Sequence, residues 1–189
     1  MPRLKQKKSF VLKVSLAMVE PSIWRRIVVP SSLSLKKLHE VLQIVMGWGN
    51  YHLHQFVTHE GAFGTPDPDF PDDTIDESRV RLDRLITRPK DHLRYDYDFG
   101  DGWEHTILLE RVIEAAADDR RVWCIDGERA CPPEDVGGPY GYLDFLVAWH
   151  DDEHEEHDTC VRWIGDEFDP EKFDVQTVNR ALTPRRRRG

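Results

Sequence analysis

The chain has 189 residues, 39% of them hydrophobic and 10% aromatic, a composition typical of a globular protein rather than a disordered one. No repeat or long linker divides it, so residues 1–183 are expected to form one domain and residues 184–189 a basic disordered tail. No apolar run approaches the roughly 20 residues of a membrane span, which excludes a membrane-spanning protein. Because the sequence opens without a secretory apolar segment and has only three cysteines, a cytoplasmic location is expected.

The formal net charge of −9 is unevenly distributed along the chain. Nine of the 26 Lys and Arg residues lie in residues 1–13 and 185–188, neither of which contains an acidic residue. The rest of the chain therefore holds 17 basic residues (26 minus 9) against 35 acidic ones. Since a body this acidic repels phosphate backbones, nucleic acid is expected to bind only weakly and through the two basic ends.

Two strands and a helix are predicted in the first quarter of the sequence. Apolar residues alternate over residues 9–19, and residues 24–29 resume a strand after the break at Pro21, which suggests an antiparallel pair. Ser34 is a suitable N-cap for a helix with helically spaced apolar residues, and Gly47 is a suitable residue to end it.

The next part of the chain is predicted to hold a third strand, a long loop and a segment of undecided structure. Residues 51–58 alternate as a strand that places His52 and His54 on one face. Residues 60–78 are rich in Gly, Pro and Asp and predict a loop, which at this length usually covers a site. Residues 79–86 fit either a short helix or an extended piece.

Residues 95–105, with the sequence Tyr-Asp-Tyr-Asp-Phe-Gly-Asp-Gly-Trp-Glu-His, indicate a hairpin around which the chain is organised. The Gly-Asp-Gly turn can supply the positive φ angles of a tight connection. The returning strand is expected to run to about Ile113 and to carry Trp103 and His105 on one face, because side chains alternate along a strand. Phe99 and Trp103 flank the turn and are expected to be buried against a helical layer.

The last third of the chain is predicted to be helical. Apolar and aromatic residues over 142–149 and 160–164 mark two helices, and Asp174 is a suitable cap for a third. Strands first and helices last predict an α+β fold. Its expected architecture is a largely antiparallel sheet with N-terminal strands, one helix after strand two, and a C-terminal helical layer.

The histidines and aspartates around the hairpin make the best candidate site. If the strand 51–58 lies beside the hairpin, His52 and His54 can point toward the face that carries His105, while Asp101 at the turn reaches the same rim. Three imidazoles and a carboxylate form a suitable ligand set for a divalent transition metal. The predicted ligand-binding residues are His52, His54, Asp98, Asp101, Trp103 and His105. In the alternative interpretation, the aspartates cap the turn and the histidines are ordinary sheet residues.

Two other metal-binding patterns are weaker. His150, His154 and His157 would align on a continuous helix, but their acidic surroundings lack the apolar shell of a catalytic zinc site. Cys124 and Cys131 have no second close pair, so small buried hydrophobic residues are the better interpretation.

Five segments are distinctive in combination. They are Pro21-Ser-Ile-Trp-Arg-Arg, His52-Leu-His54, Tyr97-Asp-Phe-Gly-Asp-Gly-Trp-Glu-His105, Ala130-Cys-Pro-Pro-Glu-Asp-Val-Gly-Gly138 and Phe168-Asp-Pro-Glu-Lys-Phe-Asp174. Over residues 8–183 the chain resembles the plasmid pRiA4b open-reading-frame-3-like family. The resemblance implies an α+β domain and leaves the activity open, since the family is largely uncharacterised. Some members are labelled transposon resolvases. Relatives often carry a cysteine where this chain has Val136, which argues against a thiolate metal site here.

Three functions are consistent with these features. The favoured one is a non-enzymatic interaction or ligand-binding module for a protein or a small cationic ligand, because the sequence contains no recognisable catalytic apparatus. The first alternative is a metal-dependent hydrolase that uses His52, His54, Asp101 and His105. The second, an accessory factor of plasmids or mobile elements, is implied by the resemblance alone.

Overall fold

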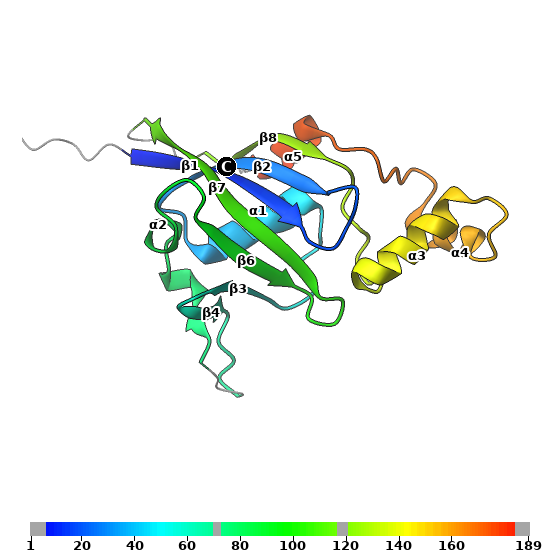
Figure 1. The fold of residues 1–189 in the computed structure, drawn as a ribbon, viewed down its shortest axis with the longest axis horizontal. Helices are drawn as coiled ribbons and strands as arrows, with labels where there is room; N and C mark the ends of the chain where they lie inside the picture. Colours follow the sequence, from blue (N-terminus) through cyan, green and yellow to red (C-terminus); the bar gives the residue numbers. More distant parts are fainter. Residues whose placement is uncertain (1–6, 70–72, 117–120, 184–189) are drawn as a thin grey trace, which may run out of the picture.

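A computed structural model describes residues 7–69, 73–116 and 121–183 (Figure 1). The predicted disordered tail, residues 184–189, lies outside these described residues. Eight strands form one sheet in the order β5-β4-β3-β6-β7-β1-β2-β8. Their bounds are β1 Lys7–Leu16, β2 Trp24–Pro30, β3 His54–Thr58, β4 Gly61–Gly64, β5 Ile75–Asp76, β6 His92–Tyr97, β7 Trp103–Ala115 and β8 Trp123–Glu128.

The sheet is antiparallel throughout except at one edge, where β4 and β5 run parallel. The helical elements are α1 Leu35–Met46, the 3-10 turn η1 Glu77–Arg79, α2 Leu82–Leu85, α3 Gly138–His150, α4 His157–Ile164 and α5 Val175–Leu182. The predicted α+β fold with a largely antiparallel sheet is confirmed. Within the described ranges, no helix has the length and apolar character that crossing a membrane requires.

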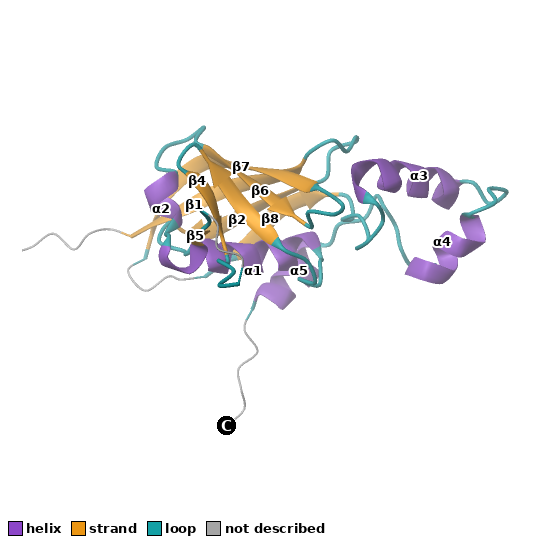
Figure 2. Ribbon diagram, turned by 90° about the horizontal axis from the view of Figure 1, so that it is seen from below, coloured by secondary structure: helices purple, strands orange, loops and turns teal. Residues whose placement is uncertain are grey.

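Helices α1 and α5 lie against one face of the sheet, whereas α3 and α4 extend beyond its end (Figures 1 and 2). The covering layer is thus formed by the early helix α1 together with the last helix, and α3 reaches the core mainly through Tyr142 and Phe145, which are both buried. Asp174 caps α5 as predicted, since its side chain accepts hydrogen bonds from the backbone of Gln176 and Thr177.

Helix α1 forms as its sequence predicts and also brings polar groups into the core. Ser34 Oγ accepts a hydrogen bond from Lys37 N, and Gly47 ends the helix in the left-handed conformation. The buried side of α1 carries leucines, valines and Met46, but it also carries His39 and Gln43, each only 4% exposed. These two polar side chains face the sheet, where both contact the hydroxyl of Tyr95 on β6.

Three predictions about local structure were wrong or incomplete. Residues 60–78 are not one loop, because they contain β4, β5 and the start of η1. Strand β8 was not predicted at all. Phe99 is 55% exposed rather than buried, because Asp98 has a φ of +55° that ends the alternation of β6 one residue before it. Trp103, by contrast, is fully buried as predicted.

Candidate functional site

Strands β3, β6 and β7 lie side by side, and their register places the predicted residues in rows. His54 pairs with Tyr97, which pairs with Trp103, and in the next row Tyr95 pairs with His105. Directly paired residues share a face of a sheet, so His54, Trp103 and His105 are on one face. That face is the one that α1 covers, not the polar rim that we expected.

His105 is a core residue. Its side chain is fully buried, its Nδ1 lies 3.1 Å from the carbonyl oxygen of Tyr95, and its ring meets Trp48 edge-on with centroids 5.2 Å apart. Among the described residues, its Nε2 has no hydrogen-bond partner. Burial lowers the pKa of His105 to about 4, because the charged imidazolium loses its hydration. His105 is therefore a neutral imidazole at physiological pH.

The hydroxyl of Tyr95 is the centre of a polar network inside the same core. Gln43 Nε2 donates to this hydroxyl over 3.1 Å, and His39 Nδ1 lies 2.8 Å from it. The other ring nitrogen of His39 lies 2.8 Å from Asn50 Oδ1, which can only accept, so His39 donates there and accepts from Tyr95. Burial raises the pKa of Tyr95 and, with the nearby His54, lowers that of His39 to about 4.

His54 completes this network. Its ring stacks on His39 with centroids 3.4 Å apart and an interplanar angle of 3°, and its Nε2 lies 3.0 Å from Glu77 Oε2. Glu77, which belongs to η1, is only 2% exposed. Asn50 is thus the partner at one end of the network and Glu77 the partner at the other. His54 is therefore part of the packed interior.

His52 has different surroundings although it is only two residues away. It precedes β3 and lies at the rim of the sheet, where its Nε2 is 3.2 Å from Asp135 Oδ1, 3.6 Å from Asp98 Oδ2 and 3.8 Å from Glu134 Oε2. This nitrogen is buried and, within the described ranges, forms no hydrogen bond of acceptable geometry. Ligand atoms of His52, Asp98 and Asp135 all lie within 4.8 Å of one another. We call these three residues the rim cluster.

The turn of the hairpin positions Asp98 in the rim cluster. The left-handed backbone at Asp98 lets its Oδ1 accept hydrogen bonds from the backbone of Gly100 (3.0 Å) and Asp101 (3.3 Å). Its second oxygen, Oδ2, is left to face His52. The Asp98 carboxylate therefore caps the turn with one oxygen and faces His52 with the other. The sequence left turn capping and a place in a site as alternatives for this residue.

Asp101 positions the segment that carries Glu134 and Asp135. Its Oδ2 accepts a hydrogen bond from Gly137 N over 3.1 Å, and a side chain at Gly138 would begin only 2.2 Å from the Asp101 carbonyl oxygen. Only glycine permits so close an approach at a φ of +71°. The two glycines after Val136 thus dock this segment onto the hairpin turn.

Glu134 is held firmly beside the rim cluster. Its Oε1 accepts hydrogen bonds from Gly49 N (2.8 Å) and from the hydroxyl of Tyr97 (3.1 Å). Burial, and secondarily the charge of Glu134, raises the pKa of Tyr97, so this phenol stays protonated and donates. These two hydrogen bonds fix the Glu134 carboxylate in an orientation that places its Oε2 3.8 Å from His52 Nε2.

The four predicted metal ligands, His52, His54, Asp101 and His105, do not converge. Within the described residues, the set of three or more ligand atoms close enough for one ion is the rim cluster, which retains only His52 of the four. His54 and His105 share a face as alternation predicts, but α1 covers that face, whereas His52 precedes β3 and does not follow the alternation of the strand. The other candidates, Cys124, Cys131, His150, His154 and His157, are not in this set either, and the three histidines are not on one helix, since α3 ends at His150 and α4 begins at His157.

Sequence reasoning about the site missed Glu134 and Asp135. A signal was present, because both residues belong to the Cys-Pro-Pro-Glu-Asp-Val-Gly-Gly segment that supported the family resemblance. What the sequence does not show is that the following glycines place this segment on the hairpin turn, more than 30 residues earlier in the chain.

The family model described as plasmid pRiA4b ORF-3-like protein matches residues 8–177. The chain belongs to this family. An uncharacterised protein, y4hQ of Sinorhizobium fredii (strain NBRC 101917 / NGR234), is 42% identical over 174 residues, which cover 90% of this chain and 89% of the relative. The crystal structure of MM3350 from Methanosarcina mazei Go1, a protein of unknown function, matches with a TM-score of 0.81 and 36% identity, over 91% of this chain and 98% of MM3350. These similarities support the fold and leave the activity open.

Proposed function

We propose that this pRiA4b ORF-3-like protein is a non-enzymatic binding module whose rim cluster holds a divalent transition-metal ion. The strongest support is the position of His52 Nε2, a buried nitrogen without a hydrogen bond among the described residues, with carboxylate oxygens at 3.2 Å and 3.6 Å. Leaving such a nitrogen unpaired is unfavourable, and a bound cation would satisfy it together with both carboxylates.

The chemistry of the donors supports this choice of ligand. One imidazole nitrogen and two carboxylate oxygens suit zinc, manganese or iron better than calcium, which prefers oxygen ligands alone. Asp98 is held in place by the backbone of the turn, whereas Asp135 has an exposed side chain that can adjust to the ion. Glu134 adds negative charge nearby.

The test is the metal content and affinity of protein purified without chelators or a histidine tag. We expect stoichiometric binding of Zn²⁺ or Mn²⁺ by elemental analysis and titration calorimetry, and a loss of about tenfold or more in affinity for His52→Gln and for Asp135→Asn, because each removes one donor. His92→Gln is the matched control, since His92 is exposed on β6. Equal affinity of wild type and His52→Gln would refute the proposed site.

Glu134 favours a second candidate, the metal-dependent hydrolase. Its carboxylate lies 3.8 Å from His52 Nε2 and is oriented by Tyr97, as a general base beside a metal would need to be. A three-donor site also keeps room for water, as catalytic zinc sites do. Turnover of phosphate or carboxylic ester substrates by the metal-loaded protein, lost in Glu134→Gln with metal binding intact, would select the hydrolase over the binding module.

The remaining expectations stay predictions. They are a protein partner, an accessory role for plasmids or mobile elements, a cytoplasmic location, and weak binding of nucleic acid through the basic ends. Salt-dependent binding of DNA that disappears when residues 1–8 and 185–188 are removed would agree with the last of these.

A further inference from the structure

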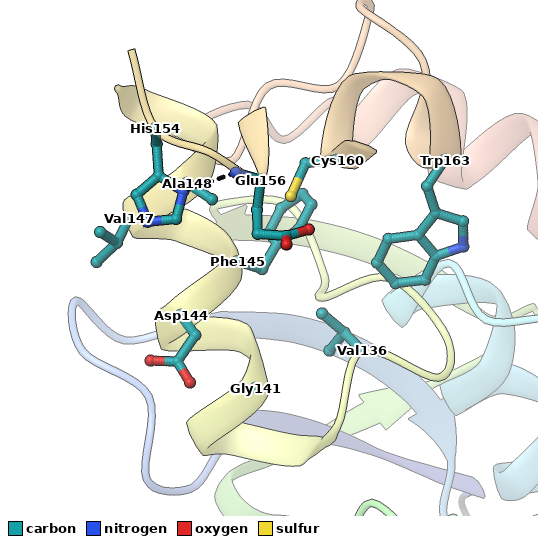
Figure 3. Close-up of a pocket in the computed structure, with 10 residues that line it drawn as sticks. All are labelled: Val136, Gly141, Asp144, Phe145, Val147, Ala148, His154, Glu156, Cys160 and Trp163. Carbon is teal, nitrogen blue, oxygen red and sulfur yellow. Dashed lines mark hydrogen bonds between the residues drawn. The ribbon is translucent and has the colours of Figure 1, made fainter. Parts of the chain in front are cut away.

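Helices α3 and α4, which extend beyond the sheet, line an open pocket of about 410 Å³ (Figure 3). Phe145 and Ala148 line it from α3, Cys160 and Trp163 from α4, and Val136 from the segment before α3. The side chains that form its interior are therefore mainly apolar. The pocket shares no lining residue with the rim cluster, although Val136 directly follows Asp135 in the chain.

Large apolar side chains are exposed at this pocket and beside it. Trp163 is 49% exposed, and on α3 Val147 is 61% and Leu143 is 41% exposed. Leu143 and Val147 are four residues apart and so lie on the same side of the helix, one turn from each other. Large apolar side chains that gather around a pocket with water on them are typical of an interaction site rather than of scattered surface residues.

Negatively charged residues lie in and beside this apolar surface. Residues 140–164 contain seven Asp and Glu residues but one arginine, Arg162. Asp144 and Glu156 line the pocket itself, and the others lie in and beside the connection between the helices. Charges of one sign around an apolar centre favour a partner of the opposite sign, because complementary charge steers the encounter and excludes wrong partners.

We propose that the pocket between α3 and α4, with the exposed apolar side chains beside it, binds a segment of another protein. In this segment one or two large apolar side chains are flanked by Lys or Arg. A pocket of about 410 Å³ has room for such side chains. The charge argues against two other occupants. A second copy of this chain would bring one acidic connection close to another, and nucleic acid would present phosphates to carboxylates. An amphipathic helix with an apolar face and basic flanks fits both observations.

The experiment uses a short, fluorescein-labelled, amidated peptide of leucine and lysine with leucines at helical spacing, and measures its anisotropy with the full-length protein at low salt. A chelator is present, so that the outcome does not depend on the rim cluster. We expect saturable, equimolar binding that weakens as salt is added. Two control peptides replace every leucine by serine or every lysine by glutamate, and both are expected to bind at least about tenfold more weakly, because each lacks one of the two complementary features.

Variants locate the binding surface. Trp163→Ala is expected to weaken binding of the leucine–lysine peptide by about tenfold, as truncation of a central aromatic side chain commonly does. Val147→Ser, at a side chain exposed enough to leave folding intact, is expected to weaken it less, and Ile125→Ser, at an exposed apolar residue of β8, is expected to have no effect. Equal binding of the serine–lysine peptide, unchanged binding by both Trp163→Ala and Val147→Ser, or concentration-dependent dimerisation that Val147→Ser abolishes would each overturn the proposal.

Discussion

His52 and His54 are two residues apart and have opposite surroundings. His54 is inside a strand, stacks on His39 and pairs with Glu77, so that both its face and its polar nitrogen are occupied by protein. His52 lies outside the strand, with a nitrogen that faces three carboxylates and no hydrogen-bond partner among the described residues. Histidines of one short motif thus divide between a closed core network and an open cluster at the rim.

The difference shows how a core can contain polar groups without forming a binding site. Gln43 and His39 of α1 hydrogen-bond the hydroxyl of Tyr95, and His54, which stacks on His39, has its own partner in Glu77 of η1. A network with partners at both ends rigidifies the packing beneath the hairpin. The rim cluster has a surplus of acceptors and one nitrogen, which is the condition for taking up a cation.

The largest expected effect sharpens this comparison at the hairpin itself. Trp103→Ala should reduce the free energy of unfolding by about 3–5 kcal/mol, because the fully buried indole would leave a cavity beside Trp48. Phe99→Ala, on the other side of the turn, is the matched control and should cost less than about 1 kcal/mol, since Phe99 is 55% exposed. Urea denaturation measures both values. Similar losses for the two variants would mean that the turn does not separate core from rim.

The second prediction uses pH to probe the core histidines. The pKa of His105 is about 4 in the folded chain and about 6.5 when unfolded, so the unfolded state binds more protons between these values. Its contribution to stability is therefore complete above about pH 6.5 and is lost as the pH falls toward 4. From pH 7 to pH 5 this residue alone should lower the free energy of unfolding by about 2 kcal/mol, and His39 acts in the same direction.

Urea denaturation of His105→Leu at the two pH values tests that prediction. The difference in unfolding free energy between pH 7 and pH 5 should shrink by about 2 kcal/mol in this variant. His92→Gln should retain the wild-type difference, because His92 is exposed. A difference between pH 7 and pH 5 that is as large in His105→Leu as in wild type would assign the pH dependence to other groups, since His39 alone should leave only part of it.

Parts of this arrangement followed from the sequence and parts did not. Alternation in β1, β6 and β7 and the helical spacing of α1 predicted the sheet, its first helix and the burial of Trp103, because those patterns are local. His54 and His105 were expected at a polar rim, because the sequence does not show that α1 would cover their face of the sheet and bring His39 and Gln43 onto Tyr95. Contacts between distant segments, as between Asp101 and Gly137, need the folded chain.

The third prediction tests whether the core network is as closed as its hydrogen bonds indicate. Glu77→Ala should cost about 1–2 kcal/mol, because it removes a buried carboxylate and leaves the Nε2 of His54 without this partner. Glu60→Ala, which removes a carboxylate from an exposed pair with Arg84, should cost less than about 0.5 kcal/mol. Thermal denaturation would compare the two variants. Equal losses of unfolding free energy would show that Glu77 stabilises the protein no more than the exposed Glu60 does.

The smallest effect on the metal-free protein is expected at His52. His52→Gln should change the free energy of unfolding by less than about 0.5 kcal/mol without metal, because no described hydrogen bond of its Nε2 is lost. His54→Gln should destabilise the protein under the same conditions, since it disrupts the stack on His39 and the contact with Glu77.

With Zn²⁺ at about 100 times its dissociation constant, wild type and His54→Gln should each gain about 2.7 kcal/mol, and His52→Gln should gain little. The two variants would then differ in two measurements. His52→Gln would lose the stabilisation by metal, and His54→Gln would be destabilised without metal. A metal-dependent rise in melting temperature that His52→Gln retains and His54→Gln loses would reverse the assignment and place the ion inside the core network.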